Sequence, residues 1–276
     1  MSSLSVLAFD TSGNLIVQRN FTASEIEAKK ATFALPESSS GTTVSFYTIA
    51  NATLGSITTK AELLSLAENS AADYNGPFAE VSAKCKRNGG FLMTGSQSRE
   101  IAAAGASTDV TIALQRTVAK VAVRTSLSSD FASKYPGKAR INTAAISKAA
   151  SRTPYFGGTA APGAMTFGYT QPSGESSGTY SNLFYLFENG PLAVGSRVLL
   201  TLDGIYDRDG NFGTTDDQTP VTYTEELTGT ANGQLLRNGY YRIAIDVSGL
   251  TGQDVTATVT VADWQTPVTQ TVSLGQ

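Results

Sequence analysis

Residues 240–262 read YYRIAIDVSGLTGQDVTATVTVA, and this stretch decides the fold class. Apolar side chains occupy every second position from Tyr241 to Val247, and again from Val255 to Val261. An alternation with a period of two places the apolar residues on one face of a β-strand. Gly, Ser and Asp residues between the two runs suit a turn. The stretch therefore predicts two strands, each with one buried face.

The same pattern recurs along the rest of the chain. Residues 4–10 and 15–21 predict a hairpin, and a capping box formed by Thr59 and Glu62 predicts one short helix that ends near Asn69. Further strands are predicted at 32–35, 43–50, 110–114, 118–124, 140–147, 182–188, 197–206, 219–227 and 268–274. Many short strands and a single helix indicate an all-β protein. We expect two tandem β-sandwich domains, residues 1–125 and 126–276, with the helix in the first.

The composition excludes many kinds of chemistry. The chain has 276 residues, enough for two domains, with His 0 and Cys 1. Without histidine there is no Ser-His-Asp triad and no His-ligated zinc, and one cysteine cannot form an intrachain disulfide. Lys+Arg 20 against Asp+Glu 23 gives a net charge of -3, which provides no basic surface for nucleic acid.

The sequence also has no apolar stretch long enough for a transmembrane span, and its N-terminus lacks the features of a signal peptide. The chain is therefore either cytosolic or the mature segment of a secreted or surface protein. The abundance of Thr, Ser and Gly favours the second interpretation.

An acidic loop follows the strand predicted at 197–206. Asp207, Asp209 and Asn211 place oxygen ligands at alternate positions, and Asp216 follows closely, an arrangement that suits Ca²⁺. The loop does not match an EF-hand, because Phe212 stands where that motif needs glycine. The alternative is a solvated hairpin loop, since Asp, Asn and Gly also form turns.

The sequence also admits two functions of different classes, a binding module and a hydrolase. A surface carbohydrate-binding module without polymerisation would need exposed aromatic residues, which the loop region of the second domain offers in Tyr155, Phe156, Phe167 and Tyr169. A hydrolase could use paired carboxylates. However, Glu225 and Glu226 are adjacent on a predicted strand, so their side chains point to opposite faces.

The order of several short motifs is more informative than any one of them. The motifs are AFD (8–10), YTIAN (47–51), TT (58–59), FLMTG (91–95), LQRTVAKV (114–121), FYLFEN (184–189), RNGYYRI (237–243) and VADW (261–264). In this order they closely resemble the fimbrillin family of Bacteroidales, the stalk and tip subunits of type V pili. The resemblance extends through nearly the whole chain.

The resemblance implies two transthyretin-like sandwich domains and a structural, adhesive subunit without catalysis. It implies export as a lipoprotein, anchoring at the outer membrane and proteolytic maturation. It also implies polymerisation with other fimbrial subunits, as a homopolymer or heteropolymer, and contacts with host or bacterial surface ligands. The signal sequence and the lipidated cysteine would lie upstream of this chain, because Cys85 is internal.

Donor-strand exchange has a clear physical basis, because a sandwich that lacks one strand exposes unpaired backbone groups and an apolar groove. The terminal segment 267–274 is the candidate donor, with Val268, Val272 and Leu274 on one side. Arg19 is the candidate site for a trypsin-like maturation cut.

Overall fold

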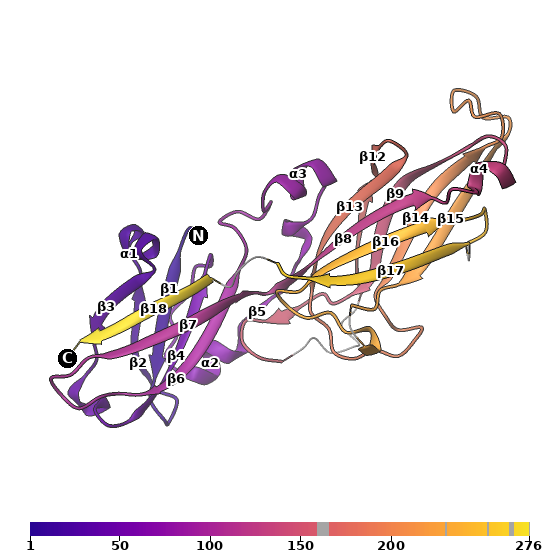
Figure 1. The fold of residues 1–276 in the computed structure, drawn as a ribbon. Coiled ribbons are helices and arrows are strands. Elements are labelled where there is room, and N and C mark those ends of the chain that lie inside the picture. The colour runs from indigo at the N-terminus through magenta and orange to yellow at the C-terminus, as the bar shows by residue number, and fades with distance from the viewer. Residues whose placement is uncertain (159–165, 230, 253, 265–267, 276) are drawn as a thin grey trace.

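The structure is a computed structural model that describes residues 1–158, 166–229, 231–252, 254–264 and 268–275. The described residues are mostly β-strand, as predicted. The molecule is elongated, with the sheet of the N-terminal half at one end and two further sheets at the other (Figure 1).

Seven strands form the N-terminal sheet. In spatial order they are β2 (Leu15–Asn20), β1 (Leu4–Phe9), β4 (Thr43–Ala50), β6 (Met93–Glu100), β7 (Thr108–Arg116), β18 (Val268–Gly275) and β3 (Lys30–Ala34). The predicted hairpin at the start of the chain is confirmed, since β1 and β2 pair antiparallel. All of β1 is buried, because one core contains Leu4 and Val6 on one side and a second core contains Leu7 and Phe9 on the other.

Two sheets pack around a common core in the second half. One has the order β11 (Phe167–Pro172), β9 (Lys138–Ala149), β14 (Leu199–Asp207) and β15 (Gln218–Glu226). The other has the order β12 (Gly174–Ser176), β13 (Thr179–Phe187), β8 (Val118–Leu127), β16 (Tyr240–Val247) and β17 (Val255–Ala262). Leu200 and Tyr223 from the first sheet share this core with Phe184 and Ile243 from the second. Strands β5 (Ala67–Glu68) and β10 (Thr153–Pro154) form a separate small ladder.

The prediction of a single helix is wrong. The predicted helix exists as α2 (Lys60–Ser65), with the capping box on Thr59, but it ends at Ser65 and not near Asn69, because Ala67–Glu68 form a strand. Three further segments are also helical: α1 (Ala23–Ala28), α3 (Phe78–Ala83) and α4 (Phe131–Lys134). Helix α1 carries a capping box of the same kind between Thr22 and Glu25, which was visible in the sequence. These helices are short, so their apolar periodicity is too brief to detect.

Several described segments connect the two halves. The chain leaves the N-terminal sheet at Thr117, between β7 and β8, and it returns after Trp264 to form β18 in the N-terminal sheet. The segment between α2 and β6 also reaches the other half, since Tyr74 and Val81 belong to the core of the second half. The division near residue 125 stays a prediction about independently folding units.

Strands β6 and β7 come very close at Gly95. They pair only at Met93 with Arg116 and at Thr94 with Gln115, and Gly95 follows directly. A Cβ atom at Gly95 would lie 2.2 Å from the backbone oxygen of Ala113, so this crossing requires glycine.

We expect Gly95→Ala to lower the free energy of unfolding by about 1–3 kcal/mol, because the added methyl group forces the two backbones apart. Gly55→Ala is the matched control, since no atom lies within 4 Å of the added Cβ there. It should change stability by less than about 0.5 kcal/mol. Urea denaturation measures both, and equal effects of the two substitutions would contradict the close approach.

Candidate functional site: the strand slot of the N-terminal sheet

The C-terminal strand β18 fills a gap between β7 and β3. It runs antiparallel to β7, from Val268 opposite Leu114 to Leu274 opposite Thr108. It runs parallel to β3, from Thr271 opposite Lys30 to Gly275 opposite Ala34. The yellow arrow of β18 accordingly lies among the indigo and purple strands of the N-terminal half in Figure 1. Without β18, the facing edges of β7 and β3 would both lose this ladder.

The register aligns the predicted donor residues with buried positions. The residues of β7 opposite Val268, Val272 and Leu274 are Leu114, Val110 and Thr108, and all three are buried. Val272 also pairs with Ala31 of β3, which is buried as well. Between these positions of β7, Asp109, Thr111 and Ala113 are exposed, whereas Ile112, which lies opposite Gln270, is buried. The apolar side of the predicted donor thus has the register of the buried face of its neighbours.

Trp264 anchors the point where the chain leaves β17 for β18. Its side chain is 7% exposed and lies against Phe91 and Tyr185, with ring centroids at 5.3 and 5.7 Å. The Arg116 guanidinium lies 4.6 Å from the Trp264 ring centroid and donates a hydrogen bond to its backbone oxygen. Aromatic and cation–π contacts of this kind stabilise a buried Trp. The C-terminal segment therefore departs from a fixed place between the two halves.

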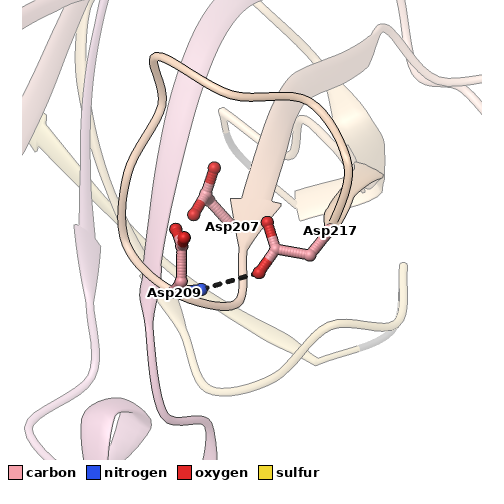
Figure 2. Close-up of side chains that lie close together, drawn as sticks. All are labelled: Asp207, Asp209 and Asp217. Atoms are coloured by element: carbon pink, nitrogen blue, oxygen red, sulfur yellow. Dashed lines mark hydrogen bonds between the residues drawn. The ribbon is translucent and has the colours of Figure 1, made fainter.

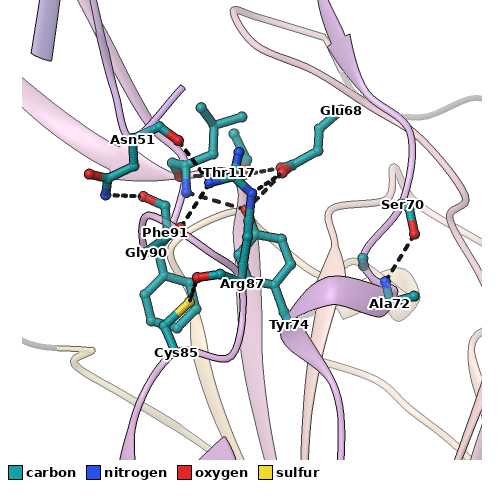
Figure 3. Close-up of polar contacts among 12 residues, drawn as sticks. Asn51, Glu68, Ser70, Ala72, Tyr74, Cys85, Arg87, Gly90, Phe91 and Thr117 are labelled. Carbon is teal, nitrogen blue, oxygen red and sulfur yellow. Dashed lines mark hydrogen bonds and ion pairs between the residues drawn. The ribbon is translucent and has the colours of Figure 1, made fainter. Parts of the chain in front are cut away.

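A second buried cluster at this junction is centred on Glu68 (Figure 3). Its carboxylate accepts hydrogen bonds from the hydroxyls of Tyr74 and Thr117, both at 2.8 Å, and pairs with Arg87 at 3.3 Å. Arg87 also donates to the backbone oxygen of Asn51, at the end of β4. The cluster thus connects β4, the segment between α2 and β6, and the crossing at Thr117.

Burial raises the pKa of Glu68, although the hydrogen bonds from Tyr74 and Thr117 and the charge of Arg87 act in the opposite direction. A carboxyl whose pKa is raised by folding stabilises the fold most when it is protonated. That contribution is present below the unfolded pKa and is lost as the pH rises through the folded pKa.

Glu68→Gln should remove this pH dependence, because the amide stays neutral. We expect the Tm of the natural protein, relative to that of Glu68→Gln, to fall as the pH rises from about 4 to about 7. Differential scanning calorimetry across this range measures the difference, with the exposed Glu27→Gln as control. A difference that does not change with pH would contradict the raised pKa.

Arg19 lies within β2, opposite Val6 of β1. Its guanidinium pairs with Glu25 at 2.5 Å and lies over the ring of Phe33 in β3. Strand β2 is at the edge of the sheet, so a protease would need to separate it from β1 and to break the contacts of Arg19 with Glu25 and Phe33. The processing role of Arg19 stays a prediction.

The four aromatic residues considered for carbohydrate binding lie in two separate places. Phe156 packs edge-on against Tyr47 of the N-terminal half, and the backbone oxygen of its neighbour Tyr155 accepts a hydrogen bond from Thr94. Phe167 and Tyr169 contact each other on β11, and Tyr169 is buried. The described residues therefore do not unite these four side chains in one exposed platform.

The acidic loop brings together Asp207, Asp209 and Asp217, with one oxygen of each within 4.8 Å of the others (Figure 2). Asp217, rather than the predicted Asp216, completes the group. The backbone N–H of Asn211 donates to both Asp207 and Asp209, so this residue closes the loop through its backbone. Its predicted side-chain oxygen accepts instead from the N–H of Gly213.

Charge repulsion is visible in the pKa values of this loop. The Asn211 N–H favours ionised Asp209, but the neighbouring carboxyls of Asp207 and Asp217 together with burial raise its pKa. Burial acts to raise the pKa of Asp207, but hydrogen bonds with Asp209, Gln218 and Asn211 outweigh it and lower the pKa. A cation would relieve this repulsion, so the calcium interpretation stays a prediction.

The calcium interpretation predicts that millimolar Ca²⁺ raises the Tm of the natural protein and that Asp217→Asn removes the shift. Asp203→Asn serves as the control, because Asp203 lies on β14 outside the loop and hydrogen-bonds Thr222. No heat on calorimetric titration and no shift in Tm would reject the metal and leave the hairpin loop.

The adjacent carboxylates considered for hydrolysis lie on β15, with Glu225 opposite Leu200 and Glu226 opposite Leu199. Burial, followed by the charge of Glu226, raises the pKa of Glu225. Successive residues of a strand point to opposite faces, so the two carboxyls do not face one substrate.

Comparison with known proteins identifies the family. The family model described as "Fimbrillin-A associated anchor proteins Mfa1 and Mfa2" matches residues 1–269. The chain belongs to this fimbrillin family. The family is structural and not enzymatic, and this fimbrillin is a fimbrial adhesion protein of Bacteroidales type V pili located at the cell surface.

Solved structures share the fold of this fimbrillin. The fimbrilin FimA of Porphyromonas gingivalis is 14% identical with a TM-score of 0.61, covering 96% of this chain and 91% of that chain. The tip fimbrial protein Mfa3 of the same organism, with a C-terminal truncation, is 14% identical with a TM-score of 0.57, covering 95% and 94%. A fimbrial assembly protein of Parabacteroides distasonis is 16% identical with a TM-score of 0.51, covering 95% and 91%.

No curated protein sequence matches this fimbrillin. Within the described residues, no helix has both the length and the apolar character needed to cross a bilayer.

Proposed function

We propose that this fimbrillin is a structural and adhesive subunit that polymerises by donor-strand exchange after proteolytic maturation. Strand β18 is the donor, and the slot between β7 and β3 of the next subunit is the acceptor. The two halves act as tandem transthyretin-like sandwiches, of which the N-terminal one carries the slot.

The position of β18 is the observation that carries the proposal. This strand is hydrogen-bonded on both edges, to β7 and to β3, although both of these strands lie far from it in the sequence. The same backbone ladder can then form with the equivalent strand of a second subunit, so an exchange conserves these hydrogen bonds.

The anchored junction supports a defined geometry for the exchange. Trp264 is held by Phe91, Tyr185 and Arg116, so the donor segment of each subunit begins at the same place between the two halves. A fixed starting point limits the directions in which the donor can reach a neighbour.

The remaining parts of the proposal concern maturation and location. The subunit derives from a lipoprotein precursor, anchored at the outer membrane, whose signal sequence and lipidated cysteine lie upstream. Arg19 is the candidate processing residue, and a cut after it would separate β1 and most of β2 from the rest of the chain. The partners are other fimbrial subunits, of the same or of a different kind, and surface ligands bound by the finished fibre.

Val272→Asp tests the donor role of β18. The substitution places a carboxylate in register with the buried residues Val110 and Ala31, and burying an unpaired charge costs several kcal/mol. This cost favours a chain whose β18 lies outside any slot over both the closed monomer and the polymer. Since about 1.4 kcal/mol corresponds to a factor of ten, we expect at least about a tenfold loss of polymer. Sedimentation and electron microscopy after limited trypsin treatment measure the polymer.

Thr271→Asp is the matched control, because its register neighbours Thr111 and Lys30 are exposed. It should polymerise like the natural protein, whereas deletion of residues 266–276 should abolish polymerisation. If the deletion left assembly intact, another segment would have to be the donor.

A further inference from the structure

Sheet edges in this fimbrillin are mostly protected against pairing with another chain. Natural proteins protect an edge strand with a charge, a proline or a short length, because its unpaired backbone groups otherwise attract a further strand. Edge strand β2 carries Arg19 and β3 carries Lys30. At the other end of the molecule, β11 ends in Pro172, β12 is very short, and β15 contains Pro220 and two glutamates.

Strand β17 lacks all of these protections. It is the last strand of its sheet, with β16 as its one neighbour among the described strands, and its eight residues VTATVTVA contain neither a charge nor a proline. Its pairing with β16 is regular from Val255 to Ala262, so no bulge turns the edge away. Among the edge strands that the structure describes, β17 alone is long, uncharged and regular.

The inner face of β17 is incompletely covered. Val255, Ala257 and Val259 pack against the core of the second half but are only partly buried, and Val261 is 59% exposed. An additional strand beside β17 would cover these apolar groups and pair the free backbone edge at the same time.

We propose that the free edge of β17 binds the β17 edge of a second copy of this chain, antiparallel about a two-fold axis through Thr258. The sequence of the strand is complementary to itself in this register. Val255 lies opposite Val261, Ala257 opposite Val259, and Thr256 opposite Thr260, with Thr258 opposite its own equivalent. Apolar residues thus face apolar residues on the inner side, and threonines face threonines on the outer side.

The charges beside the edge agree with this register. On the exposed face of β16, Arg242 pairs in the ladder with Thr260, and Asp246 pairs with Thr256. In the two-fold pair, the row through Arg242 and Thr260 continues to Thr256 and Asp246 of the second copy. Each row therefore contains one positive and one negative side chain, whereas the central row contains Ala244 and Thr258 and is neutral.

The contact is independent of donor-strand exchange, because it uses β17 and the second half, whereas the exchange uses β18 and the N-terminal sheet. The two copies point in opposite directions along their long axes. The edge therefore joins free subunits, or subunits of neighbouring fibres, and does not extend a fibre along its axis.

Single cysteines test the register in the full chain carrying Cys85→Ser. Thr258→Cys should give a disulfide-linked dimer under mild oxidation, because the two sulfurs face each other across the axis. Thr256→Cys alone should give at least about tenfold less dimer, because its two equivalents are offset by four residues, about 13 Å, beyond the reach of a disulfide. An equimolar mixture of Thr256→Cys and Thr260→Cys chains should form the linked dimer again.

A charge at the axis tests the interface without cysteines. Thr258→Lys places two positive charges opposite each other and should weaken self-association in analytical ultracentrifugation at least about tenfold. Thr224→Lys, an exposed threonine on the protected edge strand β15, should leave self-association unchanged.

Three outcomes would overturn the proposal. The first is a natural protein that stays monomeric at high concentration together with no preference for the Thr258→Cys dimer. The second is efficient linking of Thr256→Cys alone, which would require a different register. The third is an oligomer that Thr258→Lys does not weaken, as expected if exchange of β18 were the only association.

Discussion

The N-terminal half depends on the two backbone ladders that β18 forms, one with β7 and one with β3. These two strands present facing edges that no neighbouring segment in the sequence fills, and their buried residues Val110 and Ala31 border the same gap. Buried N–H and C=O groups that lack partners are costly, so the gap requires a strand. In this structure the strand comes from the far end of the chain, and the same requirement is the physical basis of the proposed polymer.

The junction between the halves determines how that distant strand arrives. Trp264 is packed among Phe91, Tyr185 and Arg116, while Glu68 collects hydrogen bonds and a charge from segments on both sides of the crossing at Thr117. Both clusters are largely buried, and a buried polar network specifies one arrangement when all its members have partners. The relative placement of the halves and the departure point of the C-terminal segment are therefore coupled.

Backbone edges have two roles in this fimbrillin. A strand that fills a gap inside a sheet forms hydrogen bonds along both of its edges and lies beside a row of buried side chains. Such a gap therefore binds a matching strand strongly. A free outer edge offers one ladder and a partly covered row, so its attraction is weaker and easily prevented by a single charge. Most outer edges of this molecule are protected and β17 is not. Pairing at an outer edge is therefore restricted to β17, whereas strand insertion is restricted to the slot between β7 and β3.

The sequence by itself determined the local features and the family. Alternating residues predicted the strands, including the first hairpin and the pair at 240–262, and the Thr59 capping box predicted α2. These properties depend on neighbours along the chain, so periodicity and capping reveal them. The absence of histidine excluded much catalytic chemistry, because composition does not depend on the fold. The order of the motifs indicated the fimbrillin family.

Only the tertiary structure decided which distant segments meet. The sequence predicts segment 267–274 as a strand that is donated to another subunit. Its alternation does not reveal that, within the same chain, β18 pairs with β7 and β3, or in which register. Asp217 and not Asp216 joins the acidic group, and the four loop aromatics separate into two places, because the direction of a loop side chain depends on the whole fold. Long-range pairing depends on how the chain closes in space, and no local pattern in the sequence records that.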